Sequence, residues 1–285
     1  MIEWLKRLKF DPIDPLLSSE NEAIRYFCRR GLLNQDAGPV ESLWQMPEAV
    51  KLFKKQLDNG SWTYPGGGKP HLRSQEDYSQ LETFRTLGIL VEKHGLTKRH
   101  PAIVRAANYL FSKQTKEGDF RGIYGHQYSP NYSAAIMELL IKAGYNDDTR
   151  IDKGFQWLVS MRQDDGGWAV PLRTAGVKLD AIAAEEAIMP DRSKPSSHWA
   201  TGVVLRAFRS PRKAAKDKHS PRCRSVPSIT ILQERQLPRQ TGRRFLGTVL
   251  LSILVHGPPV LTRLTFPDRL QPRRPTRQQR NRMVR

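Results

Sequence analysis

Aromatic and histidine side chains gather at three places in the chain, each at the start of a predicted helix or in the loop that leads into it. Aromatic rings stabilise cations through their negative faces, and the same rings also fill ordinary protein cores. The sequence identifies no partner for His126, so we assign this histidine no catalytic role. The set consists of Tyr78, then Tyr124, His126, Tyr128 and Tyr132, then His198 and Trp199.

Other residue types that carry chemistry lack the spacing that the chemistry needs. Asp147-Asp148 follows Gly144 at a predicted helix start, where acids interact favourably with the helix dipole. Cys28 falls on the apolar face of a predicted helix with no metal ligand at a suitable spacing, which favours a buried core thiol. The run Gly66 to Lys69 lacks the P-loop spacing and follows no strand. We therefore predict neither a metal nor a cofactor.

One short pattern occurs three times. Each copy has a long polar residue, an amide or acid three positions later, then Gly, any residue and a large aromatic. Repeats spaced by tens of residues mark an architecture built from one supersecondary unit. The copies run from Gln56 to Trp62, from Gln114 to Phe120 and from Arg162 to Trp168.

Each copy lies between two predicted helices. The segments before the second and third copies align with an offset of 48 residues and share helical apolar spacing. The helices after the copies are predicted to begin near Ser74, Ser129 and Ser197, with a capping box from Ser74 to Asp77. The repeated unit is therefore helix, motif, loop and helix.

The motif residues favour a structural role over a catalytic one. Gly lets the chain turn at a helix end, the aromatic covers the junction, and the polar side chains can bond orphan backbone groups of neighbouring helices. These residues are Gln56, Gly60, Trp62, Gln114, Gly118, Phe120, Asp165, Gly166 and Trp168.

The pattern resembles the QW repeat of the prenyltransferase and squalene-oxidase-repeat proteins, which include squalene–hopene cyclases and, more distantly, protein prenyltransferase β subunits. The first copy has Asn59 where that repeat has Asp, and the third has Arg162 where it has Gln. The resemblance covers about residues 40 to 208. It implies an all-α fold, an α/α toroid whose inner helices surround a cavity, with the aromatic and histidine set as candidate lining residues. With three motifs, the toroid would be incomplete.

The catalytic centres of that family are not recognisable here. Its cyclases protonate an alkene with an Asp-x-Asp-Asp motif, which this chain lacks, and its prenyltransferases bind zinc through Asp, Cys and His. Two hypotheses therefore stay open. The protein is a relative that binds or transforms an apolar, isoprenoid-like small molecule, or it is a non-enzymatic scaffold that binds a peptide or protein.

The composition changes sharply after Phe208. Of the net charge of +19, residues 209–285 contribute +16, with 19 basic and 3 acidic residues, and they contain no Trp or Tyr. Such a tail can be a basic arm that touches nucleic acid non-specifically, a solvated extension, or a translation out of frame. We favour the last, because Arg- and Pro-rich strings are typical of a shifted frame in a GC-rich gene.

The chain thus divides into a helical lead-in (1–40), a repeat domain (41–208) and the tail (209–285). Phe245 to Val255 is too short to span a membrane. The amphipathic N-terminus is not a signal peptide, and we expect it to pack as a short helix rather than bind a membrane surface. Two cysteines are too few for a disulfide framework, so we expect a cytoplasmic protein. The sequence does not determine the oligomeric state.

Overall fold

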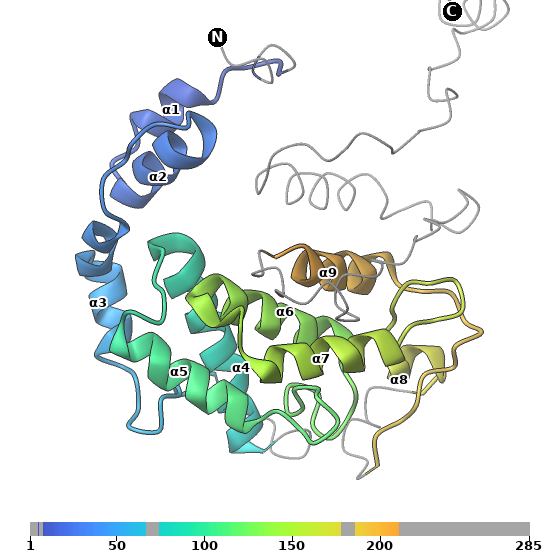
Figure 1. Ribbon diagram of the computed structural model, residues 1–285. Coiled ribbons are helices and arrows are strands. Elements are labelled where there is room, and N and C mark those ends of the chain that lie inside the picture. The colour runs from blue at the N-terminus through green and yellow to red at the C-terminus, as the bar shows by residue number, and fades with distance from the viewer. Residues whose placement is uncertain (1–4, 6–7, 67–73, 178–185, 211–285) are drawn as a thin grey trace, which may run out of the picture.

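The computed structural model describes residue 5 and residues 8–66, 74–177 and 186–210. Within these residues the chain is helical and has no strand, which confirms the predicted all-α class (Figure 1). The predicted tail lies outside the described residues from position 211 onward, as does most of the Gly66 to Lys69 run. The three-part division of the chain stays a prediction.

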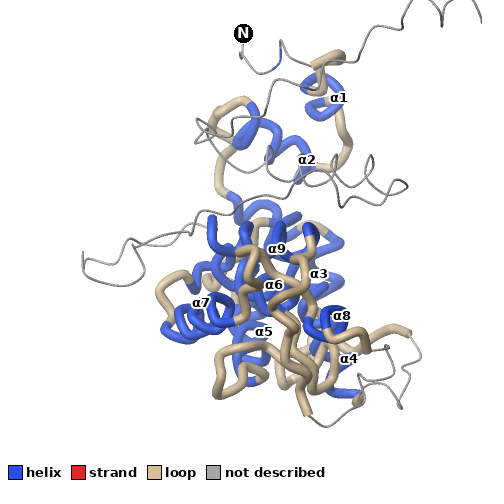
Figure 2. The backbone as a smooth tube through the Cα atoms, turned by 90° about the vertical axis from the view of Figure 1, so that its right-hand side faces the viewer, coloured by secondary structure: helices blue, strands red, loops and turns tan. Residues whose placement is uncertain are grey.

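The N-terminal part has a small core of its own. It contains α1 (Ile13–Leu17), α2 (Glu22–Phe27), a π-helical turn η2 (Cys28–Leu32) and a 3-10 helix η3 (Val40–Gln45). Ala23, Tyr26 and Leu43 form the centre of this core, and Cys28 is buried as expected. Figures 1 and 2 show α1 and α2 at one end of the molecule, away from the remaining helices.

The rest of the described chain consists of helix pairs joined by the repeated motif. The motif-preceding helices are α3 (Pro47–Phe53), α5 (Pro101–Ser112) and α7 (Thr149–Ser160). The motif-following helices are α4 (Gln75–Gly88), α6 (Pro130–Leu140) and α9 (His198–Arg209), and π-helical turns extend two of them, η4 (Ile89–Lys93) and η5 (Ile141–Tyr145). A short helix, α8 (Pro171–Thr174), lies in the third loop. Helix α6 is central, because it packs against α4, α7 and α9.

Side-chain caps fix where the helices begin. Ser74 and Asp77 form the predicted capping box of α4, in which the hydroxyl accepts from one amide and the carboxylate from the other. Ser129 and Ser197 cap the other two motif-following helices, and Asp148 caps α7. Gly144, with φ at 101°, ends the segment before α7 in a conformation that favours glycine.

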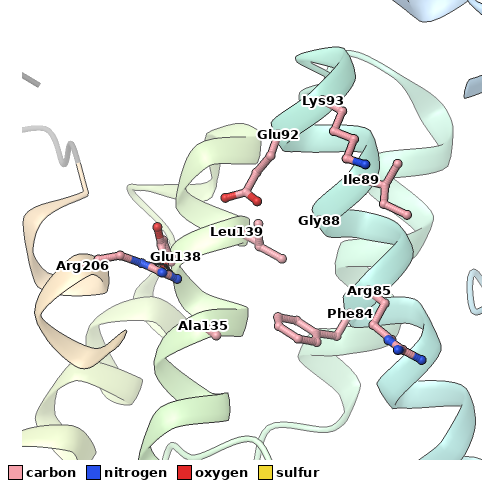
Figure 3. Close-up of a pocket in the computed structure, with 10 residues that line it drawn as sticks. All are labelled: Phe84, Arg85, Gly88, Ile89, Glu92, Lys93, Ala135, Glu138, Leu139 and Arg206. Atoms are coloured by element: carbon pink, nitrogen blue, oxygen red, sulfur yellow. Dashed lines mark hydrogen bonds and ion pairs between the residues drawn. The ribbon is translucent and has the colours of Figure 1, made fainter. Parts of the chain in front are cut away.

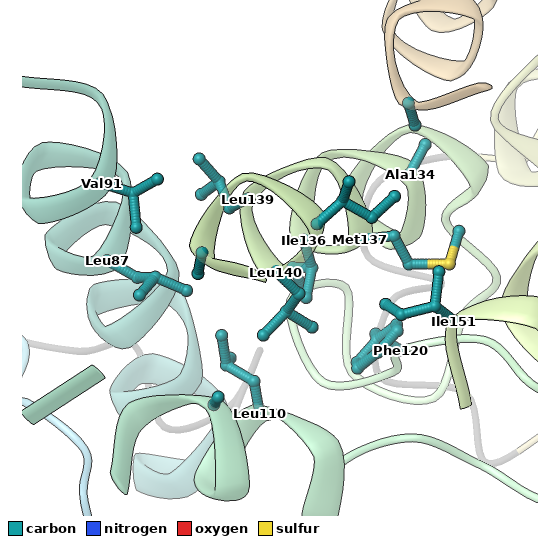
Figure 4. Close-up of a cluster of buried hydrophobic side chains, with 14 of the residues drawn as sticks. Leu87, Val91, Leu110, Phe120, Ala134, Ile136, Met137, Leu139, Leu140 and Ile151 are labelled. Atoms are coloured by element: carbon teal, nitrogen blue, oxygen red, sulfur yellow. The ribbon is translucent and has the colours of Figure 1, made fainter. Parts of the chain in front are cut away.

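The main hydrophobic core lies between the two sets of helices. Leu87 of α4, Leu110 of α5 and Leu140 of α6 are fully buried in it, together with Phe120 from the second motif (Figure 4). Because these side chains come from successive repeats, the core is continuous from one helix pair to the next.

In the first two motifs, the first polar residue bonds the motif to itself and to the next repeat. Gln56 Nε2 donates to the carbonyls of Gly60 (3.0 Å) and Ala102 (2.9 Å). Gln114 Nε2 donates in the same way to Gly118 (2.8 Å) and Arg150 (2.8 Å). The second acceptor lies in the first turn of α5 or α7. One amide group therefore holds the motif closed and attaches it to the following helix.

The third motif reproduces only the internal half of this arrangement. Arg162 Nε donates to the carbonyl of Gly166 at 3.0 Å. Asp165 instead binds the loop before α9, because its carboxylate accepts from the backbone amide of Ser196 at 2.8 Å. The residues after position 210 lie outside the described part of the chain.

The motif aromatics attach each junction to the motif-following helix. The backbone amides of Trp62, Phe120 and Trp168 donate to hydroxyls on α4, α6 and α9, at 2.9 to 3.1 Å. The acceptors are Thr83, Ser133 and Thr201. In the two tryptophan copies, the indole N–H donates back to a carbonyl of the preceding helix or its end. All three rings are buried. In the tryptophan copies, a single residue is therefore hydrogen-bonded to both helices of its pair.

Buried Glu138 attaches α9 to α6. Its Oε2 accepts from Arg206 Nε (3.1 Å) and Nη2 (2.9 Å), and its Oε1 accepts from Lys142 Nζ (2.7 Å). Lys142 also donates to Glu92 of η4 at 2.7 Å. Hydrogen bonds between ionised groups are stronger than those between neutral groups. The network therefore links all three motif-following segments.

Replacing Gly118 with Ala should destabilise the protein by about 2–4 kcal/mol. Its φ is 114°, and an added Cβ would lie 2.6 Å from the carbonyl oxygen of Lys153. The matched control is Gly31→Ala, where a Cβ meets nothing within 4 Å. We expect that control to change stability by less than about 1 kcal/mol. Urea unfolding followed by far-UV circular dichroism measures both, and equal effects would refute the role given to Gly118.

Removing the Glu138 carboxylate should also cost stability. We expect Glu138→Ala to lower the free energy of unfolding by about 1–3 kcal/mol, because two cations lose a buried partner. Glu92→Ala should cost less than about 1 kcal/mol, because that side chain is half exposed. Chemical denaturation of the two variants in parallel tests the difference. A Glu92→Ala effect as large as that of Glu138→Ala would contradict it.

Candidate functional site

A hollow of about 250 Å³ lies on the face formed by the motif-following helices (Figure 3). Its lining comes from α4 and η4 on one side, α6 at the base, and Arg206 of α9 on the other side. A hollow of this size holds a small ligand or one end of a longer chain.

The base of the hollow is apolar. Figure 3 shows the Phe84 ring directed from α4 toward α6, with Ala135 and Leu139 of α6 opposite it. Gly88 adds no side chain, and an added Cβ there would lie 3.5 Å from a methyl carbon of Leu139. The close approach of α4 to α6 at this glycine therefore shapes the base.

Charged groups surround this apolar base. Glu138 and Arg206 form their ion pair at one edge, and Glu92 extends into the hollow from η4 in Figure 3. Arg85 and Lys93 complete the charged rim. A ligand would therefore meet hydrocarbon below and paired charges at the opening.

An aromatic row continues the base toward the loop before α6. The rings of Phe84 and Tyr132 meet edge to face, with centroids 5.9 Å apart, and Tyr132 meets Tyr124 at 5.2 Å. Tyr124 also packs against the small cluster of Val170 and Leu172. Two residues of the sequence-derived set, Tyr124 and Tyr132, thus lie together in space and adjoin the hollow through Phe84.

Tyr78 and Tyr128 lie elsewhere in the fold. Tyr78 is buried near the start of α4, with its ring 5.1 Å from that of Tyr64. Tyr128 faces the second motif, where its hydroxyl donates to Glu117 at 2.9 Å and Arg121 lies over its ring at 4.5 Å. Burial, together with the hydrogen bond to Glu117, raises the pKa of the Tyr128 phenol. Tyr128 therefore belongs to the junction of the second repeat.

The remaining three candidates are exposed. His126 is in the turn before α6, and His198 and Trp199 begin α9. Trp199 is 42% exposed, which is unusual for so large an apolar side chain. None of these three lines the hollow.

Asp148 before α7 and Asp165 of the third motif have structural partners. Hydrogen bonds from Arg150 hold the pKa of Asp148 below its ordinary value. Burial works to raise the pKa of Asp165, but hydrogen bonds from Ser196 and the Gly167 amide outweigh it and hold the pKa low. Among the described residues, no three His, Cys, Asp or Glu side chains form a group that could hold a metal ion.

Sequence reasoning missed the residues that shape the hollow. Ala135, Glu138 and Leu139 all lie on one face of α6, at the three- and four-residue spacing of a helix. The signal available was Glu138, the one charged residue of α6, because buried carboxylates require partners. In the part of the chain that is described, no helix is both long and apolar enough to cross a membrane.

Comparison with known proteins agrees with this architecture. Residues 77–216 match the squalene-hopene cyclase C-terminal domain family. A squalene–hopene cyclase of Zymomonas mobilis is 28% identical over 79 residues, which is 28% of this chain and 12% of the relative. A probable squalene–hopene cyclase of Sinorhizobium fredii is 29% identical over 118 residues, 41% of this chain and 18% of the relative. No solved structure matches significantly.

The alignments cover less than a fifth of the length of either curated relative. The family match runs from α4 to α9, the helices whose junctions and packing are described above. The matched domain and the all-helical repeat fold together support a relationship of residues 77–216 to the terpenoid-cyclase-like superfamily.

Proposed function

We propose that this protein binds an apolar, isoprenoid-like small molecule on the face formed by α4, α6 and α9. The observation that carries the proposal is the apolar base of the hollow, where Phe84 faces Ala135 and Leu139 between two motif-following helices. Burial of hydrocarbon against such a surface contributes about 25 cal/mol per Å². The match to a cyclase C-terminal domain supports the same class of ligand.

The aromatic row supports the proposal. Phe84, Tyr132 and Tyr124 extend the apolar base beyond the hollow, so a chain longer than the hollow would continue along the rings. Aromatic faces also favour positive charge that develops on a bound hydrocarbon. The proposal concerns binding; a chemical step would need an acid that the sequence motifs do not supply.

A second candidate function is a scaffold for a peptide or protein. It is favoured by the charged rim of the hollow, in which Arg85, Glu92 and Lys93 are exposed. A peptide could place an apolar side chain on the base and pair its own charges with the rim. A hydrocarbon ligand gains nothing from those charges, so the two candidates differ in salt dependence.

Filling the hollow with a larger side chain should weaken ligand binding. We expect Ala135→Phe to weaken binding of farnesol, a C15 isoprenoid alcohol, at least tenfold, because the new ring occupies the space over Leu139. The matched control is Val159→Phe, which adds a ring to an exposed position on α7 outside the hollow. Isothermal titration at low and high salt measures the affinity of each variant.

The outcomes separate the two candidates. Binding that is insensitive to salt and lost in Ala135→Phe alone supports the isoprenoid site. Equal loss in both variants, or none in either, would place the ligand elsewhere. No binding of farnesol or of longer isoprenoids, with salt-sensitive binding of charged peptides that Ala135→Phe abolishes, would replace the proposal with the scaffold function.

A further inference from the structure

The N-terminal part meets the repeats through rings gathered around His100. This histidine directly precedes α5, and its ring stacks on Phe53 of α3 with centroids 4.3 Å apart and planes 27° apart. Trp44 of η3 meets the same imidazole edge to face at 5.6 Å. One histidine therefore packs against both η3 and α3.

His100 also caps α5, and it can do so only when it is neutral. Its Nδ1 accepts the backbone amide of Ala102 at 3.1 Å, so this nitrogen carries no proton in the folded protein. Protonation would turn the acceptor into a donor facing another donor. It would also place a positive charge at the positive end of the helix dipole.

A second histidine lies buried on the same side of the repeats. His94 follows η4 and is only 4% exposed, and its Nδ1 has no hydrogen-bond partner within the described parts of the chain. Burial of an imidazole without a partner disfavours its charged form. The neighbouring Gly95 is in close contact with the N-terminal part, because an added Cβ would overlap Val40 of η3.

The charged groups around both rings are mixed. Burial lowers the pKa of His100, and Arg105 lowers it further. Burial also lowers the pKa of His94, with Lys93 acting in the same direction and Glu48 of α3 opposing. Arg99, which lies over the Trp44 ring, is paired with Glu41 of η3. Glu48 is thus the acidic group that opposes the shift at His94, and burial outweighs it.

We propose that His94 and His100, with Trp44 and Phe53, form an acid-sensitive latch that holds η3 and α3 against the end of η4 and the start of α5. Protonation of the two histidines releases η3 and α3, while helices α5, α6 and α7 stay folded. The consequence is pH control over the N-terminal part by residues that do not themselves line the hollow, although His94 directly follows Lys93, which does.

The sign of the pH dependence follows from the lowered pKa values. An unfolded histidine has a pKa near 6.5, so below that pH the open form binds more protons than the closed form. The stabilisation by the latch is complete above about pH 6.5 and is lost as the pH falls through the lower folded-state pKa values. Ordinary glutamate carboxyls stay charged at pH 5.5, so the histidines dominate this interval.

Hydrogen–deuterium exchange of the full chain at pH 7.5 and 5.5, corrected for the intrinsic exchange rate, tests the latch. We expect protection of residues 40–53 to fall at least about fivefold at pH 5.5, with α6 and α7 unchanged. In His100→Asn combined with His94→Gln, which retains a side-chain acceptor before α5 and removes both titrations, the pH dependence should disappear. His126→Asn, in an exposed turn, should behave as wild type.

Three results would overturn the latch. They are equal protection of residues 40–53 at the two pH values, a fall of equal size in α6 and α7, and a pH dependence that persists in the double variant. If the double variant does not fold, NMR titration of the wild-type histidines decides the question, because a pKa of 6.5 or above for both His94 and His100 refutes the proposal.

Discussion

The arrangement of the described helix pairs depends on a glutamine side-chain amide that makes two hydrogen bonds, once in the first motif and once in the second. In the first and second motifs, glutamine donates one hydrogen to its own motif and the other to the first turn of the next motif-preceding helix. The acceptors in the next helix are the carbonyls of Ala102 in α5 and Arg150 in α7. The backbone amides of the same turns are capped by other residues, His100 and Asp148. Because the donor is nearly rigid once both bonds form, the angle between successive helix pairs is set locally. The hydrophobic core then needs only to fill a shape that these junctions have defined.

The hollow and the latch lie at different places in the repeat array. The hollow lies on the surface of the motif-following helices, where Glu138 and Arg206 hold α9 near α6. The latch lies at the N-terminal edge, where the repeated pattern meets a part of the chain with its own small core. A repeat array contacts mainly its neighbours, and the first repeat contributes to both features, because η4 lines the hollow and is directly followed by His94. The end of η4 is therefore the place where the latch and the rim of the hollow adjoin.

The junctions were readable from the sequence, and the hollow was not. The motif positions restrict which residue types can occupy them. Gln114 must reach two acceptors, Gly118 must adopt a positive φ, and Phe120 must fill a buried space. The capping box from Ser74 to Asp77 is local in the same sense and is confirmed. Glu138 and Arg206, by contrast, are 68 positions apart, and only the packing of α9 on α6 brings them together. Tyr128 likewise entered the candidate set as an aromatic beside a helix start, and its contact with Arg121 depends on how the loop closes.

The hydroxyl anchors of the motif aromatics have a consequence for how such a chain can vary. The anchor follows its aromatic by 21 positions in the first repeat, 13 in the second and 33 in the third. The same hydrogen bond from backbone amide to hydroxyl forms in all three repeats. The loop between the aromatic and its hydroxyl acceptor can therefore differ in length, because this bond fixes the position of both ends. Closure entropy rises only slowly as such a loop grows. Insertions in these loops are therefore an inexpensive source of diversity, and a descendant could acquire a new lid or recognition element there without disturbing the frame that supports it.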